Sequence, residues 1–269
     1  MTVAGGAQTS SLPEADDANG WYALGGRQLH DRRFTESRTS LLHAISLNAK
    51  LSDAYRALGE AEFELRNNDA AYRAWIKAID LNPKDTQAHY YLGRLFYEAD
   101  FFNEAAAWFR QVLALTPNHF QAMTYLGLSA EALNLEDTAH QLYRRAIDES
   151  KVQKRPYSWA FFSFSKLLRK QGHEQQALTL LQEAEQLCPE AHALSALGQL
   201  LAADKQTARA EAVLRRAVAL DPAVSEAHYR LSLLLKIMGQ PAEAELEMEN
   251  FRRAKEVEKL NNKVVAFRK

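Results

Sequence analysis

The sequence has little of what several protein classes require. Its 269 residues include a single cysteine, Cys188, which excludes an internal disulfide and a cysteine-rich metal site. No apolar run approaches the roughly 18 residues that a membrane-spanning helix needs, so we expect no membrane span. Lysine and arginine (33) nearly balance aspartate and glutamate (34), which argues against a DNA partner, because DNA-binding proteins carry a clear basic surplus. The content of hydrophobic (47%) and charged (25%) residues is that of a folded globular chain.

Motifs for catalysis or for a cofactor are also missing. The eight histidines show no metal-binding spacing, and His89 and His228 fall at positions expected in the core. The segment 127–130 (GLSA) begins like a nucleophile elbow, but Glu131 replaces the second glycine and the segment lies in an expected helix. No phosphate-binding glycine motif occurs. We therefore expect no enzyme, no catalytic residue, no metal site and no cofactor.

The chain does contain an internal repeat. Four Leu-Gly dipeptides recur at an interval of 34 residues, and a fifth follows further along. Within one unit, Gly59 and Ala71 are small where two helices must approach closely, and Trp75 is large where the next helix leaves space. Pro83 ends the unit, because proline lacks a backbone donor and stops a helix. The dipeptides are Leu24-Gly25, Leu58-Gly59, Leu92-Gly93, Leu126-Gly127 and Leu197-Gly198.

With this period and this pattern of small and large residues, the chain resembles the tetratricopeptide repeat (TPR) family. The resemblance implies an all-α fold, an α-solenoid of seven helix-turn-helix units forming a right-handed superhelix with a C-terminal capping extension. A single helical hairpin cannot bury its apolar face, so neighbouring units stack and share a core. The first residues of the units are Ala18, Ser52, Thr86, Phe120, Ser158, Ala191 and Ser225.

The repeat predicts one elongated domain with two flanking segments. Residues 1–17 lack periodicity and are predicted to be disordered. Residues 18–258 form the array, and residues 259–269 extend the last helix as a polar-backed cap. Four extra residues between the fourth and fifth units predict a longer loop near 152–157. This insertion either changes the angle between the units or is neutral.

The N-terminal sequence favours a cytoplasmic protein. Residues 2–8 look faintly like the tail of a secretory signal, but no charged or apolar region precedes them. No N-glycosylation sequence occurs. We expect a cytoplasmic location, and an extracytoplasmic one if the N-terminus is a processed or truncated form.

The resemblance also implies a ligand-binding groove. In TPR proteins the first helix of each unit lines a concave surface, at the second, fifth, ninth, twelfth and thirteenth positions. The TPR clamp for two carboxylates needs asparagine at ninth positions, and none of the ninth positions here is asparagine, so chaperone-tail binding is disfavoured. The register predicts a peptide-binding groove formed by Arg56, Tyr90, Arg94, Tyr97, Trp159, Phe162, Lys166, Arg169 and Lys170.

Charge is distributed unevenly along the chain. Residues 1–150 carry six more acidic than basic side chains, and residues 151–269 carry five more basic than acidic ones. The window 151–170 holds six basic residues, no acidic residue and five aromatic rings. Aromatic side chains beside cations suit an acidic partner segment with aromatic or apolar anchors. Alternatively, the rings only stack across the insertion and the cations only solvate the loop.

These observations predict a non-catalytic scaffold or adaptor that binds a peptide segment of a partner protein in the groove. The alternative is a self-assembling structural protein, a homo-oligomer in which the groove or an end of the stack packs on another copy. A helical repeat that binds single-stranded RNA is a further alternative, supported only by the window 151–170. RNA-reading repeats reuse the same side chains at equivalent positions, and these groove residues do not.

Overall fold

The computed structural model describes residues 13, 14 and 16–266. Within these residues the chain is helical and contains no strand, which confirms the expected all-α class. None of the described helices combines the length and hydropathy needed to cross a bilayer. The described residues form α1 (Ala18–His30), α2 (Phe34–Leu47), α3 (Ser52–Glu64), α4 (Asn68–Leu81), α5 (Thr86–Glu98), α6 (Phe102–Leu115), α7 (Phe120–Ala132), α8 (Glu136–Val152), α9 (Ser158–Lys170), α10 (Glu174–Leu187), α11 (Ala191–Ala203), α12 (Thr207–Leu220), α13 (Ser225–Ile237) and α14 (Pro241–Ala266).

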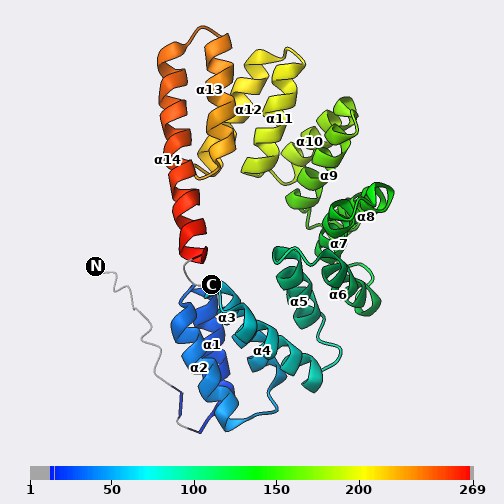
Figure 1. Ribbon diagram of the computed structural model, residues 1–269, viewed down its shortest axis with the longest axis vertical. Helices are drawn as coiled ribbons and strands as arrows, with labels where there is room; N and C mark the ends of the chain where they lie inside the picture. Colours follow the sequence, from blue (N-terminus) through cyan, green and yellow to red (C-terminus); the bar gives the residue numbers. More distant parts are fainter. Residues whose placement is uncertain (1–12, 15, 267–269) are drawn as a thin grey trace, which may run out of the picture. The chain divides into compact units, whose positions relative to one another are not determined.

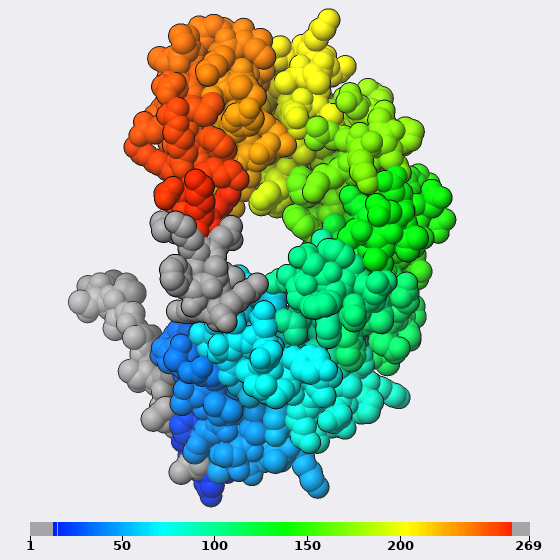
Figure 2. Space-filling view, viewed as in Figure 1, coloured from blue at the N-terminus to red at the C-terminus, as the bar shows by residue number. Residues whose placement is uncertain are grey.

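The helices follow one another as seven helix-turn-helix units. The chain divides into two compact parts, Met1–Ala99 and Asp100–Lys269, and the boundary falls between α5 and α6 of the third unit. In the first compact part α1 packs on α2, α3 on α4, and α4 on α5. In the second compact part, α7 and α8, α9 and α10, α11 and α12, and α13 and α14 pack as pairs (Figure 1). Each of these pairs contacts its neighbours in chain order, so the colours of residues 100–259 succeed one another without mixing (Figure 2). Packing between sequence neighbours is typical of a solenoid.

Small residues on one helix of a pair face large residues on the other. A Cβ atom added to Gly59 would overlap the indole of Trp75, and one added to Gly198 would lie 2.5 Å from Cγ of Leu214. Both glycines therefore mark close crossings of two helices in a densely packed core. Serine takes the place of this glycine in the fifth unit, as Ser165, and it is fully buried.

A residue with left-handed backbone conformation marks the turn between the two helices of each unit. Gly172 and Gly239 adopt it without strain, whereas the other turns use larger residues at φ near +60°. This conformation is disfavoured by roughly 1–2 kcal/mol for a residue with a Cβ atom. Packing of the two helices, rather than a glycine signal, therefore sets most turns. The turn residues are Arg32, Arg66, Asp100, Asn134, Gly172, Lys205 and Gly239.

The junction between the fourth and fifth units is partly helical. Helix α8 has 17 residues, against 14 in α10 and α12. It runs through Val152 and leaves residues 153–157 to connect it to α9.

The long C-terminal helix α14 covers α13. The hydroxyl of Ser225 donates to Glu258 (2.7 Å), and a ring nitrogen of the buried His228 lies 2.6 Å from a carboxylate oxygen of Glu247. Helix α14 continues to Ala266, through most of the expected extension 259–269. Residues 267–269, and all of the segment 1–17 except residues 13, 14, 16 and 17, lie outside the described residues.

Candidate functional site

The first helices of the last three units share one surface. Helix α9 contacts α11, and α11 contacts α13 (Figure 1). We define the first-helix surface by side chains on these three helices that contact one another or line a common cavity. Four of the predicted groove residues on α9 belong to it, and α11 and α13 supply the others. Its members are Trp159, Phe162, Lys166, Arg169, His192, Gln199, Tyr229, Arg230 and Leu233.

Three rings meet near the N-terminal ends of α9 and α11. The ring centroids of Trp159 and Phe162 are 5.4 Å apart, and they lie 6.5 and 5.9 Å, respectively, from the centroid of the His192 imidazole. Trp159 remains 37% exposed. The ammonium of Lys166 lies 5.8 Å from the centroid of the Phe162 ring, within cation–π range. This cluster is an apolar platform with a cation at its edge.

Glu190 fixes the position of His192. Its carboxylate caps α11 by accepting hydrogen bonds from the backbone N–H groups of His192 and Ala193, and it lies 2.7 Å from Nδ1 of His192. That side-chain hydrogen bond raises the pKa of His192 above its ordinary value. Burial alone would raise the pKa of Glu190, but the hydrogen bonds from His192 lower it. The pair therefore favours a protonated imidazole beside the two rings.

An NMR titration should show His192 with a midpoint above the usual value of about 6.5 for histidine. Because its folded pKa is raised, His192 stabilises the fold fully at pH values below its unfolded pKa, and this stabilisation is lost as the pH rises through the folded pKa. Glu190, whose pKa is lowered, loses its stabilising effect as the pH falls through its own folded pKa. In Glu190→Gln the His192 midpoint should fall, and an unchanged midpoint would contradict the assigned cause.

Two arginines from different helices, Arg169 of α9 and Arg230 of α13, interact electrostatically on this surface. Arg230 of α13 donates from Nη1 to the hydroxyl of Ser195 (2.9 Å) and pairs with Glu226 (3.0 Å). Burial and the nearby charge of Arg169 hold the pKa of Arg230 below its usual range. The Nε atoms of both arginines and Oε1 of Gln199 are buried without a hydrogen-bond partner among the described residues. The two guanidinium groups attract an anion that accepts hydrogen bonds.

An apolar cavity of about 320 Å³ lies between α11 and α13. Gln199 and Arg230 line it together with the more exposed Tyr229, Leu233 and Ile237, the last of which is 79% exposed. Large apolar side chains on an open surface, rimmed by polar groups, are typical of an interaction site. The first-helix surface thus combines an aromatic platform, a basic centre and an apolar cavity.

The predicted groove residues of the first compact part lie on α3 and α5: Arg56, Tyr90, Arg94 and Tyr97. Arg56 pairs with Asp85 (3.1 Å) and Glu60 (3.5 Å). Burial alone would lower the pKa of Arg56, but its acidic neighbours raise it. Arg94 pairs with Glu98 at 3.3 Å. Carboxylates of the same compact part therefore already compensate both cations.

Lys170, the ninth predicted residue, pairs with Glu136 of α8 at 2.7 Å. His192, Gln199 and Arg230 were not among the predicted binding residues, although they occupy the second, ninth and sixth positions of their units. The repeat register carried that signal for His192 and Gln199, but not for Arg230, because the sixth position is not among the groove positions. The register does not show that His192 lies beside Phe162, or that the charge of Arg169 acts on Arg230.

Reactive chemistry has little support in the described residues. Burial raises the pKa of the Cys188 thiol to about 11, which leaves very little thiolate at neutral pH. The described residues contain no group of three or more histidine, cysteine or acidic side chains that could hold a metal ion.

Comparison with known proteins bears on the fold. Residues 56–120, 93–153 and 162–225 match the family model described as "Tetratricopeptide repeat", and together they span more than half of the chain. No curated protein sequence matches.

Several solved structures are similar. The APC/C hetero-tetramer Cut9–Hcn1 contains a chain with 18% identity and a TM-score of 0.70, covering 82% of this chain and 44% of that one. PilF of Pseudomonas aeruginosa has 17% identity and a TM-score of 0.66, covering 78% and 94%. A tetratricopeptide repeat protein of Parabacteroides merdae has 16% identity and a TM-score of 0.63, covering 81% and 84%. At these identities the likeness concerns the fold.

Proposed function

Because the chain belongs to the tetratricopeptide repeat family, we propose that it is a non-catalytic scaffold or adaptor that binds a segment of a partner protein on its first-helix surface. Proteins of this family are in general scaffolds for protein–protein interaction. The aromatic platform, the basic centre and the apolar cavity of this surface all support a peptide ligand.

One observation supports the proposal most strongly: three of the buried polar side-chain atoms that lack a hydrogen-bond partner among the described residues belong to the first-helix surface. A buried donor or acceptor left unsatisfied destabilises a protein by roughly 1–3 kcal/mol, and native structures contain few of them. The Nε atoms of Arg169 and Arg230 are donors, and Oε1 of Gln199 is an acceptor; none of the three has a partner among the described residues. A peptide would supply both complements once these side chains turn outward, since its carboxylate accepts from the arginines and its backbone N–H donates to Gln199.

The same side chains favour a partner segment that carries an acidic residue and apolar side chains. An aspartate or glutamate would pair with Arg169 and Arg230. An aromatic or apolar side chain would stack on Trp159 and Phe162, and a second apolar side chain would enter the cavity at Leu233. The basic surplus of residues 151–269 favours an acidic partner during encounter as well.

A charge-reversal experiment tests the proposal. The purified chain is used to capture a partner, the partner is identified and produced, and its affinity is measured for the wild type and for Lys166→Glu/Arg169→Glu. We expect the double variant to lose binding while its helical content stays unchanged, because Lys166 is exposed and Arg169 is only half-buried on α9.

The matched control is Lys77→Glu/Arg110→Glu, which changes the same charge on the exposed second helices α4 and α6. It should bind like the wild type. Full binding by a folded Lys166→Glu/Arg169→Glu variant would contradict the site.

Self-assembly is a second candidate function because Ile237 and Leu233 expose apolar area. Light scattering over a concentration series separates the two. A constant monomer mass favours the adaptor, and a mass that rises with concentration and falls in Ile237→Glu favours self-assembly.

A further inference from the structure

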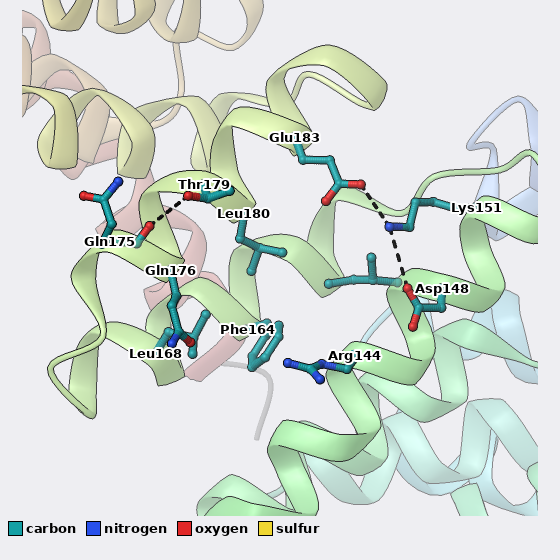
Figure 3. Close-up of a pocket in the computed structure, with 11 residues that line it drawn as sticks. Arg144, Asp148, Lys151, Phe164, Leu168, Gln175, Gln176, Thr179, Leu180 and Glu183 are labelled. Carbon is teal, nitrogen blue, oxygen red and sulfur yellow. Dashed lines mark hydrogen bonds and ion pairs between the residues drawn. The ribbon is translucent and has the colours of Figure 1, made fainter.

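A second cavity lies between α8 and α10, on the opposite side of α9 from the first-helix surface. Its volume is about 460 Å³, within the range of ligand-binding pockets. Phe164 and Leu168 of α9 form its floor, with Leu180 beside them (Figure 3), and Ile147 also lines the cavity. Because Phe164 follows Phe162 by two residues, the two rings point to nearly opposite sides of the helix. We call this space the second-helix cavity.

Ion pairs bridge the neighbouring second helices but close only one end of this cavity. Arg209 of α12 pairs with Glu185 of α10 at 3.3 Å, and a further pair joins α12 to α14. Between α8 and α10, Lys151 and Glu183 pair at 2.9 Å, near the end of α8 (Figure 3). Beyond that bridge the cavity stays open above Phe164 and Leu168, which are themselves buried (5% and 2% exposed).

Arg144 is the cation on this rim that forms no ion pair among the described residues, although the rim as a whole is neutral, with two cations (Arg144 and Lys151) and two carboxylates (Asp148 and Glu183). Lys151 already has two carboxylate partners, Glu183 and Asp148, the latter at 3.6 Å. Arg144 lies two turns earlier on α8 and has no hydrogen-bond or ion-pair partner within the described region of the chain. Figure 3 shows its guanidinium directed toward the cavity beside Phe164. A carboxylate is the complement that a guanidinium binds best.

The opposite wall carries neutral polar groups. Gln175, Gln176 and Thr179 of α10 line it, and Gln176 lies beside Leu168 (Figure 3). A glutamine amide both donates and accepts hydrogen bonds, which matches the alternating groups of a peptide backbone. The cavity therefore combines an apolar floor, one available cation and one amide wall.

We propose that the second-helix cavity binds a short segment of a partner protein in which one or two apolar side chains adjoin an aspartate or glutamate. The apolar side chains of the segment enter the cavity above Phe164 and Leu168, and removal of the segment's own apolar surface from water drives binding. The carboxylate pairs with Arg144 and sets the orientation, while Gln176 hydrogen-bonds to the backbone. The site does not depend on the first-helix surface being a binding site. Together the two surfaces allow α9 to link two segments on opposite sides.

Peptide selection tests the proposal in the full chain. The bait carries Lys166→Glu/Arg169→Glu, so that the first-helix surface is disabled. A phage library of random short peptides is panned on this bait and counter-selected on the same bait with Arg144→Glu added. We expect enriched peptides that combine an acidic residue with leucine, isoleucine or phenylalanine.

The best of these peptides is then synthesised with a fluorescent label and titrated by anisotropy. Its affinity should fall at least tenfold in Arg144→Glu and in Thr179→Trp, which fills the cavity from an exposed position. Arg145→Glu, the neighbouring exposed charge, should change affinity less than threefold. Circular dichroism confirms that each variant is folded.

Three results would overturn the proposal. The first is that no peptide is enriched after counter-selection. The second is that the enriched peptides lack an acidic residue or bind Thr179→Trp as tightly as the wild type. The third is that light scattering shows a dimer that Thr179→Trp dissociates, which assigns the cavity to a second copy of the chain. None of these results bears on the first-helix surface, because the bait already lacks it.

Discussion

Replacing Trp75 with alanine is expected to destabilise the first compact part of the chain by about 3–5 kcal/mol, the range for removing a large aromatic side chain from a core. The indole of Trp75 is fully buried and stacks on Tyr91 with 5.3 Å between centroids. Its Nε1 donates to the backbone carbonyl of Arg56 at 3.2 Å. Trp75 thus joins α4 to α3 and α5, and those helices cannot close the resulting cavity without moving.

Native-state hydrogen exchange measures this effect, because it reports the opening free energy of individual helices. Amides of α3, α4 and α5 should lose protection. Arg73→Ala, an exposed change on the same helix, should stay within about 0.5 kcal/mol of the wild type. Trp75→Leu should recover some of the loss, since Leu214 fills the corresponding place over Gly198. Equal protection in Trp75→Ala and Arg73→Ala would contradict the assigned role.

The adjacent phenylalanines of α9 should give opposite phenotypes. Phe161 is fully buried in the core, so Phe161→Ala should destabilise the second compact part by about 3–5 kcal/mol. Phe162 is partly exposed and contacts Trp159 and His192. Phe162→Ala should lower stability by about 1 kcal/mol but weaken partner binding at least tenfold, as expected for an aromatic anchor.

Urea unfolding and a partner titration separate these outcomes when both variants are measured at a temperature at which both are folded. Phe162→Leu keeps an apolar side chain without an aromatic ring, so it should bind with intermediate affinity. If Phe162→Ala bound the partner like the wild type, the aromatic platform would have no role in recognition. If Phe161→Ala were as stable as Phe162→Ala, the assignment of faces on α9 would be wrong.

Much of the fold could be predicted because the repeat is a local pattern. Gly59 and Trp75 lie on consecutive helices of one hairpin, so their small and large volumes predict a close crossing without knowledge of the rest of the chain. The first helices begin at Ala18, Ser52, Thr86, Phe120, Ser158, Ala191 and Ser225, the residues at which the sequence pattern places the seven units. Helical periodicity likewise separates the buried Phe161 and Phe164 from Phe162.

The sequence predicted the candidate site less well than the fold, because a charged side chain on the predicted groove face can already be paired with another residue of the protein and so be unable to bind a ligand. Arg56 occupies a groove position but pairs with Asp85, the N-cap residue of α5, and Lys170 pairs with Glu136 of α8. Arg144 belongs to no repeat signature, yet it is left without a described partner beside an open cavity. The sequence pattern cannot distinguish these cases, since partners on other helices decide them.

The sequence by itself determined the helices, the repeat number and the core positions of this protein. These follow from side-chain size and hydrophobicity at spacings of one or two helical turns, which act within a single hairpin. Only the tertiary structure decided which polar groups remain available to a ligand. The Arg230–Ser195 hydrogen bond and the electrostatic effect of Arg169 on Arg230 join different units, and such interactions depend on how closely neighbouring hairpins pack. Both proposed binding surfaces depend on that packing, because each includes polar and apolar side chains that the packing of neighbouring hairpins leaves without a partner among the described residues.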